Sequence, residues 1–186
     1  MQARKGTAGK SAVESCARCD RLEAESDRRT AMDIISLTVV SAAFALGDAM
    51  PAQYTCEGAN VSPPLSWSAV PAGTKSIAVL SDDPDCPGGW VHWVLINLPP
   101  EARELPEDVE PDPELPDGSI QGITDFRRPG YGGPCPPPGR PHRYFFRVYA
   151  LDKKLDLSPR TEMKDVQKAM AGHILAQGET MGRFGR

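Results

Sequence analysis

Short apolar or alternating runs of strand length begin at Ile34 and are separated by clusters of Pro, Gly, Asn and Asp. The clearest runs are residues 76–82 (SIAVLSD), 91–98 (VHWVLINL) and 143–151 (RYFFRVYAL). The last two are rich in aromatic and β-branched residues, which suit the pleated and half-buried surface of a sheet. The pattern therefore predicts strands in these three segments.

A helical pattern occurs near the C-terminus. Apolar residues recur at spacings of three and four from Met163 to Ile174, after Pro159 and a candidate N-cap at Thr161. We expect this helix to cover one end of the sheets, and a short final strand to run through Phe184.

The chain holds 19 Pro and 17 Gly without any repeat, which favours many turns and a β architecture over a helical bundle. Its 186 residues are enough for one sizeable core. We predict one all-β domain over residues 32–186. Residues 1–31 are polar and charged without an apolar period, so we expect a disordered or non-native leader there.

Residues 34–46 are the only candidate for a membrane span, but they fall short of the roughly 20 apolar residues that a span needs. Ser36, Thr38 and Ser41 interrupt the apolar run as they would in a strand, and we take it as the first strand of the domain. If translation starts at Met32, the run instead imitates a signal peptide. We expect a cytoplasmic protein, with export as the alternative.

The chain has 21 Lys and Arg against 25 Asp and Glu, a formal charge of −4. This balance argues against the basic face that a nucleic-acid backbone requires. Eight of the acidic residues and four prolines lie in residues 101–117. We expect a surface loop there, either a solvated insertion or a specificity element.

The five cysteines fit neither a disulfide-rich scaffold nor paired zinc knuckles. Cys16 and Cys19 have the spacing of half a zinc site or a redox pair, but no second pair accompanies them. Cys56 and Cys135 fall in loop motifs. They either form a disulfide or remain free thiols, because sequence alone does not supply their distance.

Candidate chemistry begins directly after the strand at 76–82. Residues 82–87 (DDPDCP) lead through two glycines into Trp90 and His92. The two prolines fix φ and withhold N–H donors, so the carboxylates lie on a stiff, turned segment. A second cluster, residues 130–144 (GYGGPCPPPGRPHRY), has glycines that let backbone amides approach a ligand and prolines that hold the loop open.

Strand alternation places His142 on the apolar face of its strand. By the same rule His92 faces inward together with Val94. A buried imidazole needs a polar partner, and Asp83 or Asp85 is suited to that role. Two imidazole donors and loop amides would make a compact site for one phosphate-sized anion.

The two clusters, together with residues 54–58 (YTCEG) and 60–67 (NVSPPLSW), resemble the phosphatidylethanolamine-binding protein family and its bacterial Raf-kinase-inhibitor-like branch. The resemblance runs from about Ile34 to the C-terminus. It implies two antiparallel sheets in a β-sandwich with short peripheral helices. The ligand-binding residues expected from the clusters and the resemblance are Asp83, Asp85, Pro87, Trp90, His92, Tyr131, Gly133, Pro136, Pro137, His142 and Tyr144.

The resemblance implies a non-enzymatic protein that binds phosphate-bearing small molecules or phospholipid head groups, without cofactor or metal. One alternative is an inhibitor of an unidentified kinase or protease that acts through the rim of the same pocket. Another is a metal-dependent hydrolase in which Asp83, His92 and His142 hold the metal. Against the hydrolase, the sequence lacks the nucleophile and zinc-protease motifs.

Overall fold

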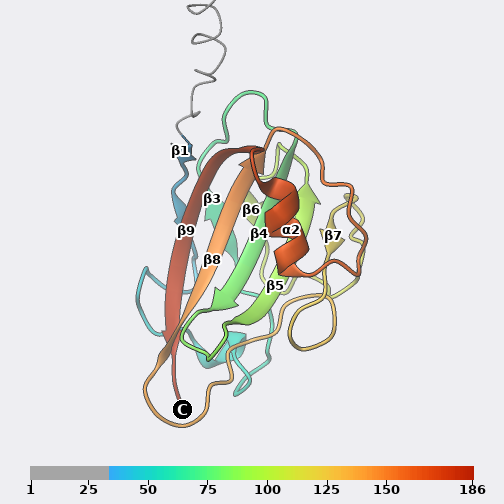
Figure 1. Ribbon diagram of the computed structural model, residues 1–186. Coiled ribbons are helices and arrows are strands. Elements are labelled where there is room, and N and C mark those ends of the chain that lie inside the picture. Colours follow the sequence, from blue (N-terminus) through green and yellow to red (C-terminus); the bar gives the residue numbers. More distant parts are fainter. Residues whose placement is uncertain (1–33) are drawn as a thin grey trace, which may run out of the picture. The chain divides into compact units, whose positions relative to one another are not determined.

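The computed structural model describes residues 34–186 (Figure 1). The expectations for residues 1–31, including the Cys16–Cys19 pair, lie outside the described residues. The elements are β1 (Ile35–Ser36), β2 (Val39–Val40), the 3-10 helix η1 (Ala52–Tyr54), β3 (Leu65–Trp67), β4 (Ser76–Asp83), β5 (Trp90–Leu98), β6 (Glu104–Leu105), β7 (Ile120–Gln121), β8 (His142–Leu151), α2 (Met163–Met170) and β9 (Ile174–Phe184).

The strands form two sheets, as predicted. The larger sheet has the order β1-β9-β8-β4-β5-β7 and the smaller one β2-β3-β6. Neighbouring strands run antiparallel except β1, which pairs parallel with β9. The three strands predicted most clearly from the sequence correspond to β4, β5 and β8, which lie side by side in the larger sheet (Figure 1).

Each face of the larger sheet has its own apolar core. The first cluster joins the two sheets, with Trp67 of β3 among side chains such as Trp93 and Phe146. The second cluster lies beneath α2, where Val166 and Met170 pack with residues of β4 and β5 such as Leu80. Burial on both faces explains why β4 reads as a continuous apolar run.

Helix α2 is shorter than the apolar spacing predicts. It ends at Met170, and Gly172, with a φ of 78°, turns the chain so that Ile174 begins β9. Its N-cap is Glu162 rather than Thr161. The helix covers a face of the larger sheet, not an end, and the final strand β9 is 11 residues long because it pairs along all of β8 (Figure 1).

The run at residues 34–46 does not form one strand. Its first part, β1, pairs with β9 of the larger sheet, and its second part, β2, pairs with β3 of the smaller sheet. Leu37, between the two strands, is buried. The run therefore crosses from one sheet to the other. Within residues 34–186 there is no helix long and apolar enough to span a membrane.

The acidic segment 101–117 is better anchored than a solvated insertion. It contributes β6 to the smaller sheet, with Leu105 buried. The Glu107 carboxylate accepts hydrogen bonds from the Tyr54 hydroxyl at 2.5 Å and from Gln53 Nε2 at 2.9 Å. Burial and this carboxylate raise the pKa of Tyr54 to about 12, so the tyrosine remains a donor at neutral pH.

Candidate anion-binding site

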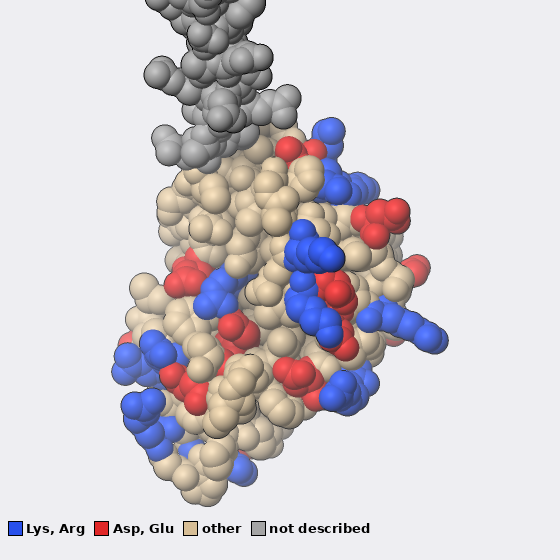
Figure 2. Space-filling model, in the orientation of Figure 1, with Lys and Arg blue, Asp and Glu red and all other residues tan. Residues whose placement is uncertain are grey.

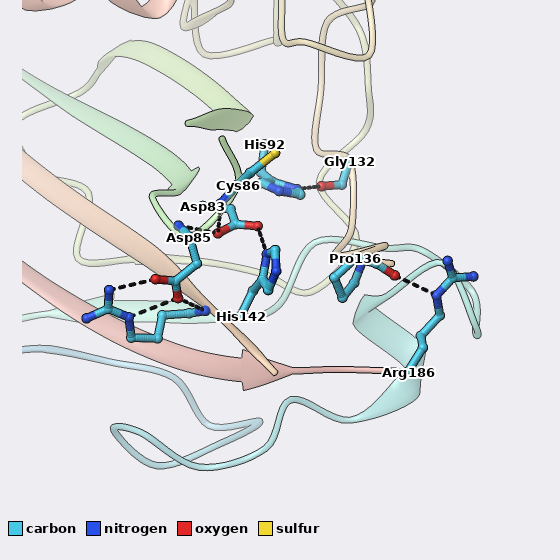
Figure 3. A network of polar contacts seen from close by, with 9 residues as sticks. Asp83, Asp85, Cys86, His92, Gly132, Pro136, His142 and Arg186 are labelled. Carbon is cyan, nitrogen blue, oxygen red and sulfur yellow. Dashed lines mark hydrogen bonds and ion pairs between the residues drawn. The ribbon is translucent and has the colours of Figure 1, made fainter. Parts of the chain in front are cut away.

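Asp83 ends β4 and is almost fully buried, with 3% of its surface exposed. Its Oδ1 accepts the backbone N–H groups of Asp85 at 2.8 Å and Cys86 at 3.2 Å. Pro84 lies between Asp83 and Asp85 in the sequence, and its fixed φ restricts the turn. The other oxygen, Oδ2, lies 2.7 Å from Nδ1 of His142 (Figure 3). Asp83 therefore stabilises the turn that follows β4 and orients the imidazole of His142 on β8.

His142 is the first residue of β8, and its strand neighbour on the same face is Tyr144. Because a carboxylate accepts only, the Nδ1 atom of His142 carries the hydrogen shared with Asp83. Nε2 remains for a ligand. The Tyr144 hydroxyl is buried and has no hydrogen-bond partner within residues 34–186. Burial and the Asp83 carboxylate raise the pKa of Tyr144, which keeps its hydroxyl protonated.

His92 has a backbone partner, not an aspartate. Its Nδ1 donates to the carbonyl oxygen of Gly132 at 2.5 Å, and the Gly132 N–H donates back to the His92 carbonyl at 2.9 Å. The rings of Phe126 and Tyr144 lie edge-on, with centroids at 5.5 and 5.1 Å. Burial lowers the pKa of His92. The neutral ring thus has a lone pair on Nε2, which makes this atom a hydrogen-bond acceptor where the sequence suggested a donor.

Strand alternation fails at His92. The pairing of β4 with β5 shifts between Ser81 and Asp82, leaving His92 as an extra residue on β5. Val94 belongs to the core beneath α2, whereas the His92 ring contacts Tyr144 of the inter-sheet core. The prediction that His92 shares the face of Val94 is therefore wrong, although the inward orientation is correct.

These side chains line a cavity of about 190 Å³. Its walls are Asp83, Cys86, Trp90, His92, Phe126, Cys135, Pro136, Pro137, His142 and Tyr144. Seven of the eleven residues expected from the sequence are among them. The cavity is smaller than a typical drug-sized pocket of roughly 300 Å³ or more, so its volume limits it to a small group.

Four expected residues lie outside the cavity lining: Asp85, Pro87, Tyr131 and Gly133. The Asp85 carboxylate pairs with the Arg143 guanidinium at 2.7 and 3.0 Å, and these hydrogen bonds lower the pKa of Asp85 to about 2. Tyr131 is buried and donates through its hydroxyl to the Tyr54 carbonyl at 2.9 Å. These two residues position the walls instead of lining them.

Gly133 donates its N–H to Asn60 Oδ1 at 2.7 Å. A Cβ there would meet Asn60 Oδ1 and the Tyr54 carbonyl oxygen at 2.5 Å. The glycine is needed for this close approach, which fixes the start of the proline-rich wall. Pro87 is exposed on the turn after Asp83.

Sequence reasoning missed Cys86, Phe126 and Cys135 as lining residues. The proximity of Cys86 to Asp83 along the chain is a usable signal. Phe126, by contrast, lies in a separate loop outside the two sequence clusters. Its ring packs edge-on against that of Trp90, with centroids 5.6 Å apart. Nothing local in the sequence marks it.

Cys56 and Cys135 form a disulfide with a Cα–Cα distance of 5.4 Å, which decides between the two alternatives left open by the sequence. The neighbouring backbone is joined as well, since the Cys56 N–H donates to the Pro134 carbonyl at 3.0 Å. The bond ties the segment after η1 to the wall formed by Pro136 and Pro137. It therefore holds one side of the cavity.

A two-sheet β fold, with an Asp–His pair at the end of its larger sheet, defines the structural class. A sequence model described as phosphatidylethanolamine-binding protein matches residues 40–185. The chain belongs to this family, as the resemblance implied.

Curated relatives carry the name UPF0098 protein. The one from Methanothermobacter thermautotrophicus is 51% identical over 138 residues, covering 74% of this chain and 91% of the relative. The one from Aquifex aeolicus is 48% identical over 153 residues, covering 81% and 89%. These names indicate no catalytic activity.

Two solved structures are similar over 81% of this chain and 98% of theirs. YbcL of E. coli, described as a new member of the mammalian family, is 37% identical with a TM-score of 0.76. CT736 of Chlamydia trachomatis, a homologue of the phosphatidylethanolamine-binding proteins, is 36% identical with a TM-score of 0.74.

Proposed function

We propose that this protein is a non-enzymatic binding protein that holds phosphate-bearing small molecules or phospholipid head groups in the cavity around Asp83 and His142. The observation that carries the proposal is the Asp83–His142 pair beside the unpartnered Tyr144 hydroxyl of the described chain. Both groups line a small cavity, where Tyr144 donates through its hydroxyl and His142 donates through Nε2 when both of its ring nitrogens carry hydrogen. The family's name supports the same class of ligand.

The charge of Asp83 determines the protonation state in which an anion binds. A phosphate next to this buried carboxylate is repelled unless His142 is positively charged. A protonated His142 keeps its Nδ1–H bond to Asp83 and directs an Nε2–H donor at the ligand. His142 is therefore expected to bind an anion in the form that carries hydrogen on both ring nitrogens.

His92 and the aromatic wall favour a ligand that also carries a donor. Neutral His92 accepts a hydrogen bond, which an ammonium group or a phosphate O–H supplies. Trp90 and Phe126 line the same cavity, and aromatic rings attract a cation that lies over their face. Phosphoethanolamine is thus expected to bind more tightly than inorganic phosphate.

The side-chain geometry supports binding over metal-dependent hydrolysis. Both oxygens of Asp83 are engaged, and Nδ1 of each pocket histidine is hydrogen-bonded. Across residues 34–186, no three His, Cys, Asp or Glu side chains are grouped as a metal site would require. Stoichiometric zinc or iron in untagged protein, with hydrolysis of a phosphate ester, would overturn this part of the proposal.

The test is calorimetric titration with inorganic phosphate and with phosphoethanolamine. His142→Ala should weaken both by 10- to 100-fold, since a charge-assisted hydrogen bond contributes about 1.5–3 kcal/mol. His173→Ala is the matched control, because the Nδ1 atom of this partly exposed histidine also lies 2.8 Å from an aspartate oxygen, Oδ1 of Asp152, outside the cavity. Absence of saturable binding at millimolar ligand, or equal affinity in His142→Ala and the unmodified protein, contradicts the proposal.

The cytoplasmic location and a kinase or protease target remain predictions. The Cys56–Cys135 disulfide favours the export alternative, because such bonds persist mainly in oxidising compartments. Fractionation of the native organism decides the location. Recovery of the protein in the cytoplasm with both thiols free would remove the argument for export.

A further inference from the structure

A second concave surface lies where β8 begins and β9 ends. It is a groove of about 940 Å³, five times the volume of the anion cavity, and it shares no lining residue with that cavity. We name it the arginine groove after the side chains that give it its charge. Its walls include Met50, Arg140, Pro141, Arg143, Arg183 and Phe184.

The groove is basic in an acidic domain. Residues 34–186 contain 14 Lys and Arg against 19 Asp and Glu, a net charge of −5. The groove lining instead carries three arginines and one carboxylate, that of Asp85, a net charge of +2. Figure 2 shows blue side chains gathered over the end of the molecule where β8 begins. This local reversal of charge is suited to an anionic partner.

Two of the arginines form no direct ion pair within residues 34–186. The Arg143 guanidinium is bound to Asp85, whereas the exposed side chains of Arg140 and Arg183 make no ion pair or hydrogen bond with any other residue of the described chain. Arg183 also lies directly opposite Arg143 across β8 and β9. Like charges in such a cross-strand pair disfavour the sheet, and an acidic group between them would relieve the repulsion.

The rest of the lining is apolar. Phe184 is half-buried and packs against the core shared by the two sheets, to which the buried Met50 belongs. Pro141 completes this floor. A small inorganic anion gains no binding energy from apolar side chains, and a flat lipid surface does not enter a concave groove. A polypeptide segment with an apolar anchor and flanking carboxylates fits both features.

We propose that the arginine groove binds an acidic segment of a partner protein, with an apolar side chain on Phe184 and carboxylates at Arg140 and Arg183. This binding does not depend on the anion cavity, since His142 and the groove arginines point to different surfaces: His142 lines the cavity and Arg143 lines the groove. The groove adds a protein-binding surface to the ligand pocket.

The test uses a fluorescein-labelled peptide in which Glu and Asp alternate with Leu and Phe, followed by fluorescence anisotropy on the full chain. The double variant Arg140→Glu and Arg183→Glu should weaken binding at least tenfold. Lys154→Glu with Lys168→Glu, two exposed lysines outside the groove, makes the same change in net charge. This control should change the affinity less than twofold, and His142→Ala should leave it unchanged.

Three results overturn the proposal. Equal weakening by both double variants shows only general charge attraction. Loss of binding in His142→Ala shows that the peptide occupies the anion cavity. No peptide binding, with groove-dependent binding to vesicles of anionic phospholipid, assigns the surface to a membrane. Circular dichroism of each variant confirms that it is folded, so that a failed variant is not mistaken for a lost contact.

Discussion

The Cys56–Cys135 disulfide is expected to contribute a calculable part of the free energy of unfolding. The bond closes a loop with a sequence separation of 79 residues. In the chain-entropy treatment, closing a loop of that length removes about 15 cal/mol/K from the unfolded chain, equivalent to about 4.5 kcal/mol at 25 °C. Native domains are stable by roughly 5–15 kcal/mol. Cys56→Ser with Cys135→Ser should therefore remove about 30% or more of the stability.

The assay is equilibrium unfolding in guanidinium chloride, followed by tryptophan fluorescence with and without dithiothreitol. The reductant should lower the unfolding midpoint of the unmodified protein to that of the double variant, and it should leave the double variant unchanged. Cys86→Ser is the control, because Cys86 lines the same cavity but is the free cysteine of the described residues. Its midpoint should still fall on reduction.

The same bond should affect the ligand site, because Cys135, Pro136 and Pro137 form one wall of the cavity. Phosphate affinity is expected to fall in the double variant under conditions where it remains folded. A midpoint insensitive to the reductant, or a loss of less than about 1 kcal/mol in the double variant, would refute the entropy argument.

Three further predictions follow from the pocket and its support. Burial lowers the pKa of His92 below the unfolded value of about 6.5. The stability that depends on the neutral His92 is therefore complete above pH 6.5 and is lost as the pH falls, by up to about 1.4 kcal/mol per pH unit. His92→Gln should flatten the pH dependence of the unfolding free energy between pH 7 and 5. An unchanged slope would show that His92 does not cause this dependence. Trp90 is 37% exposed at the cavity, while the other two tryptophans are buried, so phosphoethanolamine should change the fluorescence of the protein but not of Trp90→Phe. Gly133→Ala should destabilise the fold by about 1–3 kcal/mol, because its Cβ meets two oxygens at 2.5 Å; a thermal melt equal to that of the unmodified protein disproves the clash.

The outcome for β4, β5 and β8 shows what local pattern can predict. Each is a run of apolar and β-branched residues bounded by turn residues, and each forms a strand close to its predicted limits. On β8 the alternation also holds, since Tyr144 and Phe146 are buried on the face of His142. Phe145 lies on the other face, where the Arg147 Cζ atom is 4.7 Å from the centroid of its ring. The alternation of side chains along β8 itself places Phe145 on the face opposite Tyr144 and Phe146.

Alternation failed where the backbone deviates from a regular ladder. The bulge at His92 moves its ring to the inter-sheet side, and Asn97, with a φ of 62°, precedes a second change of face at Leu98. Bulges depend on how neighbouring strands are paired and twisted. A single run of residues does not contain that information.

The sequence by itself determined the β class, the main strands, and a small set of turn and loop residues from which an Asp–His site could be assembled. Those properties depend on hydrophobic period and turn chemistry, which act over a few residues. Only the tertiary structure decided that Asp83 and not Asp85 meets His142, that His92 binds a loop carbonyl, and that Phe126 closes the cavity. The same is true of the disulfide and the arginine groove. These contacts join segments tens of residues apart, so they are set by the packing of two sheets and the register of β8 against β9.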